Sequence, residues 1–198
     1  MTEGITFQTE RLTLRPPVLE GAHPIFRNCA SDPEVTRYLT WRPHADVEQT
    51  ERFLQWCLDR WDSGAEFTWV ITLRGSDEAI GMVSSRREGH KANLGYVLTR
   101  RFWGRGIMTE AAGRVADWLR ASPEIYRVWS TCDVENRASA RVLEKVGLER
   151  EGVLRRWIVH PNLSPEPRDS FMYAVSITSE GAHRILPGTG SWVLPRAL

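Results

Sequence analysis

Residues 101–107 read Arg-Phe-Trp-Gly-Arg-Gly-Ile, a short stretch with two glycines and two arginines. Gly104 and Gly106 permit backbone torsions and a close approach that a residue with a Cβ resists, so successive N–H groups can point at one anion. The positive end of a following helix adds to that attraction. The stretch therefore predicts a phosphate-binding turn.

The flanks of this turn strengthen the prediction, because a glycine pair alone also makes ordinary strand-to-helix turns. Residues 93–99 alternate like a half-buried strand. After the turn, apolar residues recur at helical spacing, namely Ile107, Met108, Ala111, Ala112, Val115, Trp118 and Leu119. Strand, turn and helix thus follow in the order that an anion-binding helix terminus requires.

Two common phosphate motifs are excluded by the residues themselves. The chain contains no G-x-x-x-x-G-K-[ST], and Thr109 stands where a third glycine would complete G-x-G-x-x-G. A dinucleotide site therefore loses its main support.

Composition indicates one globular domain over residues 1–198, with a core over about 9–179 and a C-terminal tail over 180–198. The 198 residues carry 26 basic and 25 acidic side chains, a net charge of +1, so nothing draws the whole chain to nucleic acid or membrane. No signal peptide or membrane span is recognisable, and three dispersed cysteines fit reduced thiols. We expect a cytoplasmic protein without a bound metal, because no histidine pair has ligand spacing.

The order of expected elements indicates an α/β fold. A strand over 10–15 is followed by helices over 19–30, from 33 toward 39, and over 46–62. Three strands over 67–73, 79–85 and 91–99 form a meander joined by short turns. A helix over 106–121, a strand over 127–134 and a helix over 137–146 suggest parallel crossovers. Strands over 149–160 and 170–177 flank a proline-rich loop, and the tail after Ser179 is expected to be loosely held.

Three segments in this order resemble the GCN5-related N-acetyltransferase (GNAT) superfamily, and in particular its ribosomal-protein-alanine/serine N-terminal acetyltransferase branch. Residues 101–111 match R/Q-x-x-G-x-G/A and W-G-x-G-x-x-T-E-A. Residues 136–148 are similar to N-x-x-S-x-x-x-x-E-K-x-G-F/L, and residues 9–15 form the opening Thr-Glu-Arg-Leu-Thr-Leu-Arg.

The resemblance implies a mixed, mostly antiparallel sheet, splayed at its centre between the strands over 91–99 and 127–134, with helices on both faces. It implies acetyl-CoA as the acyl donor. Backbone groups of Val97 and Thr99 would pair with the pantetheine arm, and Asn136 would hydrogen-bond it. The pyrophosphate would lie on the amides of the turn, among the cofactor-binding residues Arg101, Trp103, Gly104, Arg105, Gly106 and Ile107.

The implied reaction is attack of a neutral amine on a thioester, which needs a proton acceptor for the ammonium and a donor for the leaving thiolate. Ser139 is the candidate donor near the sulfur. Both Ser139 and Asn136 also suit a simpler role at a helix N-terminus.

No residue declares itself as the base. Ile158 stands where some members of this branch have a glutamate, and Asn93 replaces an acid common in related enzymes. His160 and Asp169 remain as candidates, although either also suits a structural or surface role. A water chain, or capture of amine that is already neutral, is the alternative.

The acceptor pocket, by the same resemblance, involves Tyr38, Trp41, Arg42, Trp69 and Trp157. Most of the nine tryptophans are expected in the core, and Trp41 is the one most suspected of touching substrate. The acceptor is a primary amine, either a protein N-terminus or a small molecule. A CoA-binding regulatory module without catalysis, or transfer from a longer acyl-CoA, stays open, as does a homodimer.

Overall fold

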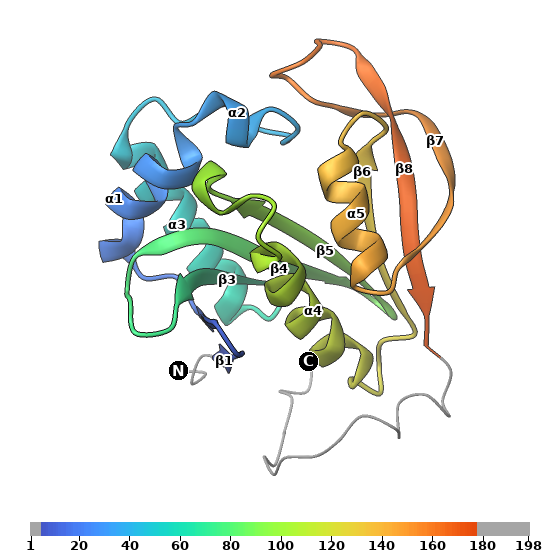
Figure 1. Ribbon diagram of the computed structural model, residues 1–198, viewed down its shortest axis with the longest axis horizontal. Coiled ribbons are helices and arrows are strands. Elements are labelled where there is room, and N and C mark those ends of the chain that lie inside the picture. The colour runs from blue at the N-terminus through green and yellow to red at the C-terminus, as the bar shows by residue number, and fades with distance from the viewer. Residues whose placement is uncertain (1–4, 178–198) are drawn as a thin grey trace.

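The computed structural model describes residues 5–177, which form one eight-stranded sheet in the order β1-β2-β3-β4-β5-β6-β8-β7 (Figure 1). The strands are β1 Phe7–Gln8, β2 Leu12–Arg15, β3 Glu66–Leu73, β4 Ala79–Glu88, β5 Lys91–Leu98, β6 Arg127–Asp133, β7 Glu149–Val159 and β8 Pro167–Ser176. The α-helices are α1 Ala22–Ile25, α2 Pro33–Thr36, α3 Val47–Asp62, α4 Ile107–Arg120 and α5 Arg137–Lys145. The expected α/β fold with a mixed sheet is confirmed.

Among the described strands, one neighbouring pair is parallel and all the others are antiparallel. Strands β1 to β5 pair antiparallel, which confirms the predicted meander. Strands β5 and β6 pair parallel, over Lys91–Asn93 and Arg127–Trp129. The sequence suggested more than one parallel crossover, but within residues 5–177 only the β5–α4–β6 crossover gives a parallel pair. The reason is that β8 inserts antiparallel between β6 and β7.

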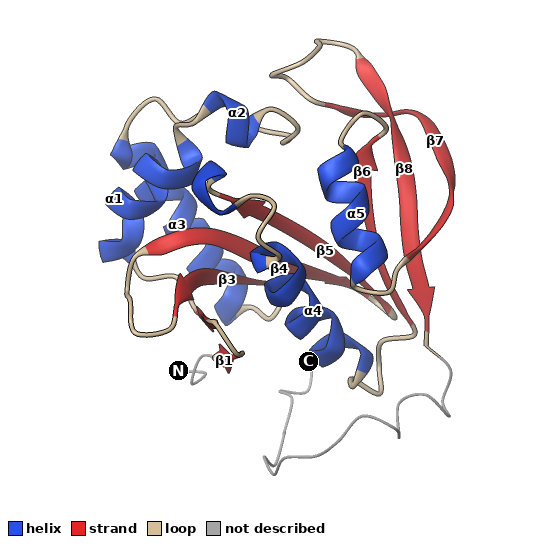
Figure 2. Ribbon diagram, in the orientation of Figure 1, coloured by secondary structure: helices blue, strands red, loops and turns tan. Residues whose placement is uncertain are grey.

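The short β5–β6 pairing produces the splay at the centre of the sheet. Beyond Asn93 and Trp129 the two strands separate, so the C-terminal parts of β5 and β6 have no strand between them. Figure 2 shows them diverging toward the α2 side of the molecule, with α5 beside β6. We call this divergence the fork.

Helices cover both faces of the sheet, as the continuous burial of β3 from Thr68 to Thr72 requires. Val70 packs in one cluster with Ile25 of α1 and Leu54 of α3. Its neighbours Trp69 and Ile71 belong to the larger cluster on the other face, which contains the buried side of α4. The centre of the sheet at β3 is therefore packed from both sides.

Local signals explain most helix boundaries. Asp46 caps α3 by accepting from the N–H of Gln49. The expected single helix over 19–30 is instead three short segments, a 3₁₀ turn over Leu19–Gly21, α1, and a π-helical turn over Phe26–Ala30. Pro24 lies in the middle and lacks the N–H that a continuous helix needs.

Within residues 5–177, no helix is long and apolar enough to cross a bilayer. The tail expected after Ser179 lies outside the described residues.

Candidate active site

The glycine turn has the backbone geometry predicted for an anion site. Gly104 and Gly106 adopt φ values of 73° and 74°, and Gly106 is the residue before the first turn of α4. Within the described residues, no acceptor is found for the backbone N–H groups of 104–106. The first N–H groups of α4 are likewise unpaired by helix geometry. Several donors are therefore exposed together at the start of α4.

An ion pair ties this turn to the beginning of the sheet. The Arg11 Nε lies 2.6 Å from Glu110 Oε2, in the first turn of α4. The Arg11 N–H and the Thr9 hydroxyl both donate to Glu110 Oε1, at 2.9 and 2.5 Å. Arg11 Nη1 also donates to the Arg105 carbonyl, at 3.0 Å.

The pKa of Glu110 reflects this network. Burial alone would raise it, but the bonds from Thr9 and Arg11 outweigh burial and lower it. The carboxylate therefore stays ionised beside the turn, and the Arg11 guanidinium neutralises its charge.

The side chains of the turn are engaged in different ways. Arg101 pairs with Glu78 at 2.8 Å, so its guanidinium is held by a carboxylate from the β3–β4 turn. Trp103 donates its indole N–H to the Leu98 carbonyl at 2.7 Å while half of the residue stays exposed. Arg105 is exposed over the Phe102 ring. Of the two arginines, Arg105 is the one without a carboxylate partner among the described residues.

The strand-like contacts predicted for Val97 and Thr99 are wrong by one residue. The N–H of Thr99 donates to Ile80 of β4, and N–H groups on alternate residues of a strand point the same way, so Val97 also faces β4. On the other side, the Leu94 carbonyl accepts from Ser130 of β6. The backbone groups of Tyr96 and Leu98 therefore face the fork.

The side chain of Asn136 caps α5. Its Oδ1 accepts from the N–H of Ser139 at 3.1 Å, which confirms the capping role that the sequence left open. This bond uses the amide oxygen only, so the Nδ2 group still has two hydrogens to donate.

A cluster of hydroxyl and thiol groups surrounds Ser139. The Ser139 Oγ lies 2.8 Å from the hydroxyl of Tyr96, across the fork. It also contacts the Cys132 thiol, whose pKa is raised to about 11 chiefly by burial and held back by the bond to Ser139. The remaining cysteines, Cys29 and Cys57, are buried elsewhere.

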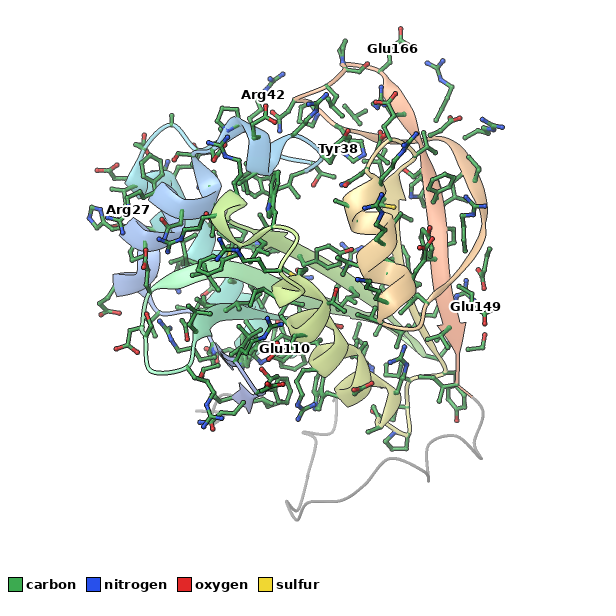
Figure 3. The ribbon with its side chains drawn as sticks, in the orientation of Figure 1. Arg27, Tyr38, Arg42, Glu110, Glu149 and Glu166 are labelled. Atoms are coloured by element: carbon green, nitrogen blue, oxygen red, sulfur yellow. The ribbon has the colours of Figure 1, made fainter. Side chains whose placement is uncertain are left out.

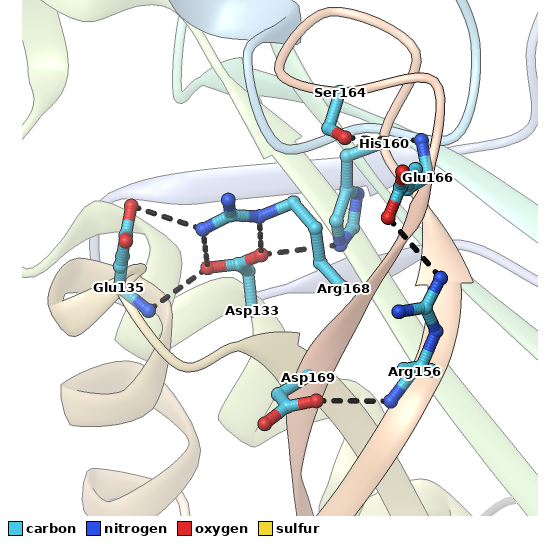
Figure 4. Close-up of polar contacts among 8 residues, drawn as sticks. All are labelled: Asp133, Glu135, Arg156, His160, Ser164, Glu166, Arg168 and Asp169. Carbon is cyan, nitrogen blue, oxygen red and sulfur yellow. Dashed lines mark hydrogen bonds and ion pairs between the residues drawn. The ribbon is translucent and has the colours of Figure 1, made fainter.

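A buried charge network lies at the end of β6 (Figure 4). Asp133 is buried and pairs with Arg168 through Nε at 2.6 Å and Nη2 at 3.2 Å. Burial would raise the pKa of Asp133, but the bonds from Arg168 and the Glu135 N–H outweigh it and lower it. Arg168 also reaches Glu135, and its own pKa is raised by the Asp133 bond.

The imidazole of His160 lies against this network. Its Nε2 is 3.9 Å from Asp133 Oδ2, and only 4% of the residue is exposed. Both ring nitrogens are buried without a hydrogen-bond partner among the described residues. Both nitrogens can therefore form a hydrogen bond with a substrate group.

The surroundings of Asp169, the second candidate base, do not suit that role. One of its carboxylate oxygens accepts from the Arg156 N–H and the other pairs with Arg155. These bonds, in that order, lower its pKa. It also neighbours Arg168 in β8, so its side chain projects to the opposite face of the sheet from the Asp133 network.

The predicted acceptor residues divide into two groups. Trp41 is half-buried against His44, and Tyr38, labelled in Figure 3, lies in the same segment between α2 and α3. Arg42 is exposed and lines a shallow surface pocket with Arg37 and Leu163. These residues share one region of the structure.

The other two predicted residues, Trp69 and Trp157, lie on strands of the sheet. Trp69 is fully buried, packs on Trp61 and Trp118, and donates its indole N–H to Ile5, so assigning it to the acceptor site was wrong. Trp157 is half-exposed on the edge strand β7, at an irregularity in its pairing with β8.

Asn162, in the loop between β7 and β8, connects that loop to residues 36–41, and the sequence did not indicate this. We call these two stretches the acceptor-side segments. Its Nδ2 donates to the carbonyls of Thr36 and Trp41, at 2.7 and 2.8 Å. Tyr96, Asp133 and Arg168 were also missed as site residues. Each depends on a partner that is 35 to 43 residues away in the sequence, so local patterns gave no signal for them. No cluster of potential metal ligands occurs in the described part of the chain.

Comparisons with known proteins agree with this geometry. Residues 11–149 match the family model of the acetyltransferase (GNAT) domain. The chain is 34% identical to the uncharacterized N-acetyltransferase p20 of Bacillus licheniformis, over 76% of this chain and 85% of that protein.

Two solved structures share the fold. One is a GNAT-family acetyltransferase from Bacillus anthracis, with a TM-score of 0.76, 24% identity, and coverage of 87% of this chain and 98% of that chain. The other is RimL, a ribosomal L7/L12 alpha-N-protein acetyltransferase, in complex with CoA in a CoA–cysteine disulfide, with a TM-score of 0.78, 22% identity and the same coverage.

The glycine turn, the fork and the family match lead to one conclusion. The chain belongs to the GNAT family and is an N-acetyltransferase that uses acetyl-CoA.

Proposed function

We propose that this enzyme acetylates a primary amine, the α-amine of a peptide or a small-molecule amine, on the His160 side of the fork. The observation that carries the proposal is buried His160 beside the ionised Asp133, with both ring nitrogens lacking a hydrogen-bond partner within residues 5–177. A base at this position meets the need of the reaction, because an ammonium must lose a proton before it can attack.

The residues of the fork fit the donor. The free N–H groups of 104–106 and of the first turn of α4 would hold the pyrophosphate, with Arg105 adding charge. The fork-facing N–H and carbonyl of Tyr96 and the N–H of Leu98 would pair with the pantetheine amides, while the Leu98 carbonyl accepts from Trp103. The Asn136 Nδ2 group would donate to a pantetheine carbonyl.

Two side chains would handle the protons. His160 would accept the proton of the attacking ammonium, and the Asp133 carboxylate, 3.9 Å away, would stabilise the imidazolium that forms. The Ser139 hydroxyl would donate a hydrogen bond to the sulfur as the C–S bond breaks and the electron pair moves to sulfur.

A peptide N-terminus is the acceptor class we favour. The acceptor-side segments are held together by Asn162 and flank an open surface pocket rather than an enclosed cavity, which suits an extended chain. RimL, a structural neighbour, is itself an α-N-protein acetyltransferase.

An amine panel tests this function. Thiol release from acetyl-CoA would be measured with peptides beginning with Ala, Ser or Asp, with the same peptides blocked at the N-terminus, and with small primary amines. Turnover of the free peptides alone would support the favoured acceptor. Turnover of small amines alone would support a small-molecule acceptor. Repeating the assay with longer acyl-CoA donors in place of acetyl-CoA would test whether they are preferred.

One observation favours a second candidate. Ile158 lies on β7 where some relatives of this branch carry a glutamate, so a CoA-binding module without catalysis remains the rival. Tight CoA binding with no thiol release for any amine would support it. We further propose that the chain is a single domain and that the protein is cytoplasmic. We also propose that it forms a homodimer, and analytical ultracentrifugation would test that oligomeric state.

A further inference from the structure

The hydroxyls of Tyr96 and Ser139 meet across the fork. Tyr96 lies on β5 beyond the last residue that pairs with β6, and Ser139 lies in the first turn of α5, 43 residues later. Their oxygens are 2.8 Å apart, and the Tyr96 hydroxyl is also 3.1 Å from the Ser139 carbonyl oxygen. This contact links the two halves of the sheet where they have separated.

The hydrogens of this pair can be arranged in two ways, because each hydroxyl has one hydrogen and two lone pairs. In one arrangement Tyr96 donates to the Ser139 carbonyl and Ser139 donates to Tyr96, so both hydrogens are used. In the other, Tyr96 donates to the Ser139 Oγ, and the serine hydrogen is free for a third group. Both arrangements use the same heavy-atom positions, so a change between them needs only rotation of two O–H bonds.

Tyr96 is suited to be a lasting donor rather than an acid. Burial, the largest influence, raises the pKa of its hydroxyl well above the ordinary value, and the bond to Ser139 offsets only part of that rise. The phenol therefore keeps its proton throughout the physiological range.

We propose that Tyr96 is a positioning residue for acetyl transfer, donating to the Ser139 Oγ and so directing the serine hydrogen toward the CoA sulfur. The inference rests on the role of Ser139 under the proposed function. A leaving thiolate is stabilised by a donor that is already oriented when charge develops, and the Tyr96 bond supplies that orientation.

The test measures the thiol of bound CoA, so it does not depend on the acceptor. CoA saturating the enzyme is alkylated with iodoacetamide over a range of pH, and the CoA adduct is quantified by mass spectrometry. The rate profile gives the pKa of the bound thiol. We expect Tyr96→Phe to raise this pKa by about one unit, a tenfold loss of thiolate at a given pH, with the CoA dissociation constant nearly unchanged.

Tyr173→Phe is the matched control. Tyr173 is also buried and also bonds a residue of α5, Glu144, at 2.9 Å, but it lies in the core of the sheet. Loss of its hydroxyl should leave the pKa of bound CoA unchanged. An equal shift in both variants would mean a general disturbance of α5 and would overturn the proposal.

A double-variant cycle separates this inference from the proposed function. Ser139→Ala should raise the thiol pKa as Tyr96→Phe does, and combining the two should add less than a further twofold change in thiolate. A shift with Ser139→Ala but none with Tyr96→Phe overturns the role of Tyr96 alone. No shift with either variant overturns the role of Ser139, and the Tyr96 inference with it.

Discussion

Arg11, in the link between β1 and β2, forms an ion pair with Glu110, in the first turn of α4. The Nε and Oε2 atoms are 2.6 Å apart, and Arg11 also holds the Arg105 carbonyl. A carboxylate at this helix terminus would repel a phosphate, so the guanidinium both anchors the turn and neutralises the charge beside it.

Replacing Arg11 should therefore weaken CoA binding. In Arg11→Gln the Glu110 carboxylate keeps its bonds from Thr9 and the backbone but loses the positive charge that neutralises it. We expect the dissociation constant of CoA to rise about tenfold, measured by calorimetry. Adding Glu110→Gln should recover part of the lost affinity, because the repelling charge is removed. If the double variant binds as weakly as Arg11→Gln, charge neutralisation is not the reason.

Gly104→Val should also weaken CoA binding, because a β-branched residue resists a φ of 73° and places atoms where the donor approaches. Gly75→Val is the matched control, since Gly75 has a φ of 78° and equally open surroundings in the β3–β4 turn. Both variants should lose thermal stability to a similar extent. Only Gly104→Val should raise the CoA dissociation constant, by about tenfold or more; an equal effect of both would place the pyrophosphate elsewhere.

His160→Gln should lower kcat by about a hundredfold with little change in CoA affinity, because a positioned base contributes at least that much to proton transfer. Steady-state kinetics would measure kcat, and calorimetry would measure the affinity for CoA. His90→Gln, at an exposed turn, is the control. Unchanged kcat in His160→Gln would favour a water chain or capture of neutral amine.

Cys132 offers a direct probe of where the CoA sulfur lies. In CoA disulfide, one sulfur would be attacked by the Cys132 thiolate, giving a protein–CoA mixed disulfide and releasing one CoA thiolate. Because the pKa of Cys132 is raised to about 11, the thiolate fraction and the trapping rate should rise about tenfold per pH unit below that value.

Intact mass and peptide mapping would locate the adduct. Cys29 and Cys57 are internal controls, because burial raises the pKa of both to about 12 and neither lies at the fork. Labelling of these two at the same rate as Cys132, or persistence of the adduct in Cys132→Ala, would contradict the placement of the sulfur near Ser139.

Asn162→Asp should impair the acceptor and spare the donor. The change removes the amide hydrogens that hold the Thr36 and Trp41 carbonyls and places a carboxylate against them. We expect KM for the acceptor to rise about tenfold, in line with the loss of two hydrogen bonds, with CoA affinity unchanged. A parallel loss of CoA affinity would show that the loop supports the donor site instead.

Short-range chemistry explains what could be predicted. The turn at Gly104 and Gly106, the cap of α3 at Asp46 and the cap of α5 at Asn136 each depend on residues within a few positions of one another. Such features follow from backbone torsions and hydrogen bonds of neighbouring residues, so a linear pattern carries them.

The wrong predictions depended on which side of a strand a residue faces, or on partners far away in the sequence. Placing Val97 and Thr99 on the fork was wrong because a shift of one residue along a strand reverses which side its backbone groups face. Trp69 could not be told from a surface tryptophan until its partners on α3 and α4 were known.

The sequence by itself determined the donor, because two glycines with positive φ, a helix start and an asparagine cap are local features that together specify a CoA-binding turn. Only the tertiary structure decided the reacting end of the site. His160 meets Asp133, Tyr96 meets Ser139 and Asn162 meets Trp41 through contacts between segments far apart in the chain. Those meetings arise because β8 inserts beside β6 and the fork opens after Asn93, and packing of the whole sheet sets both.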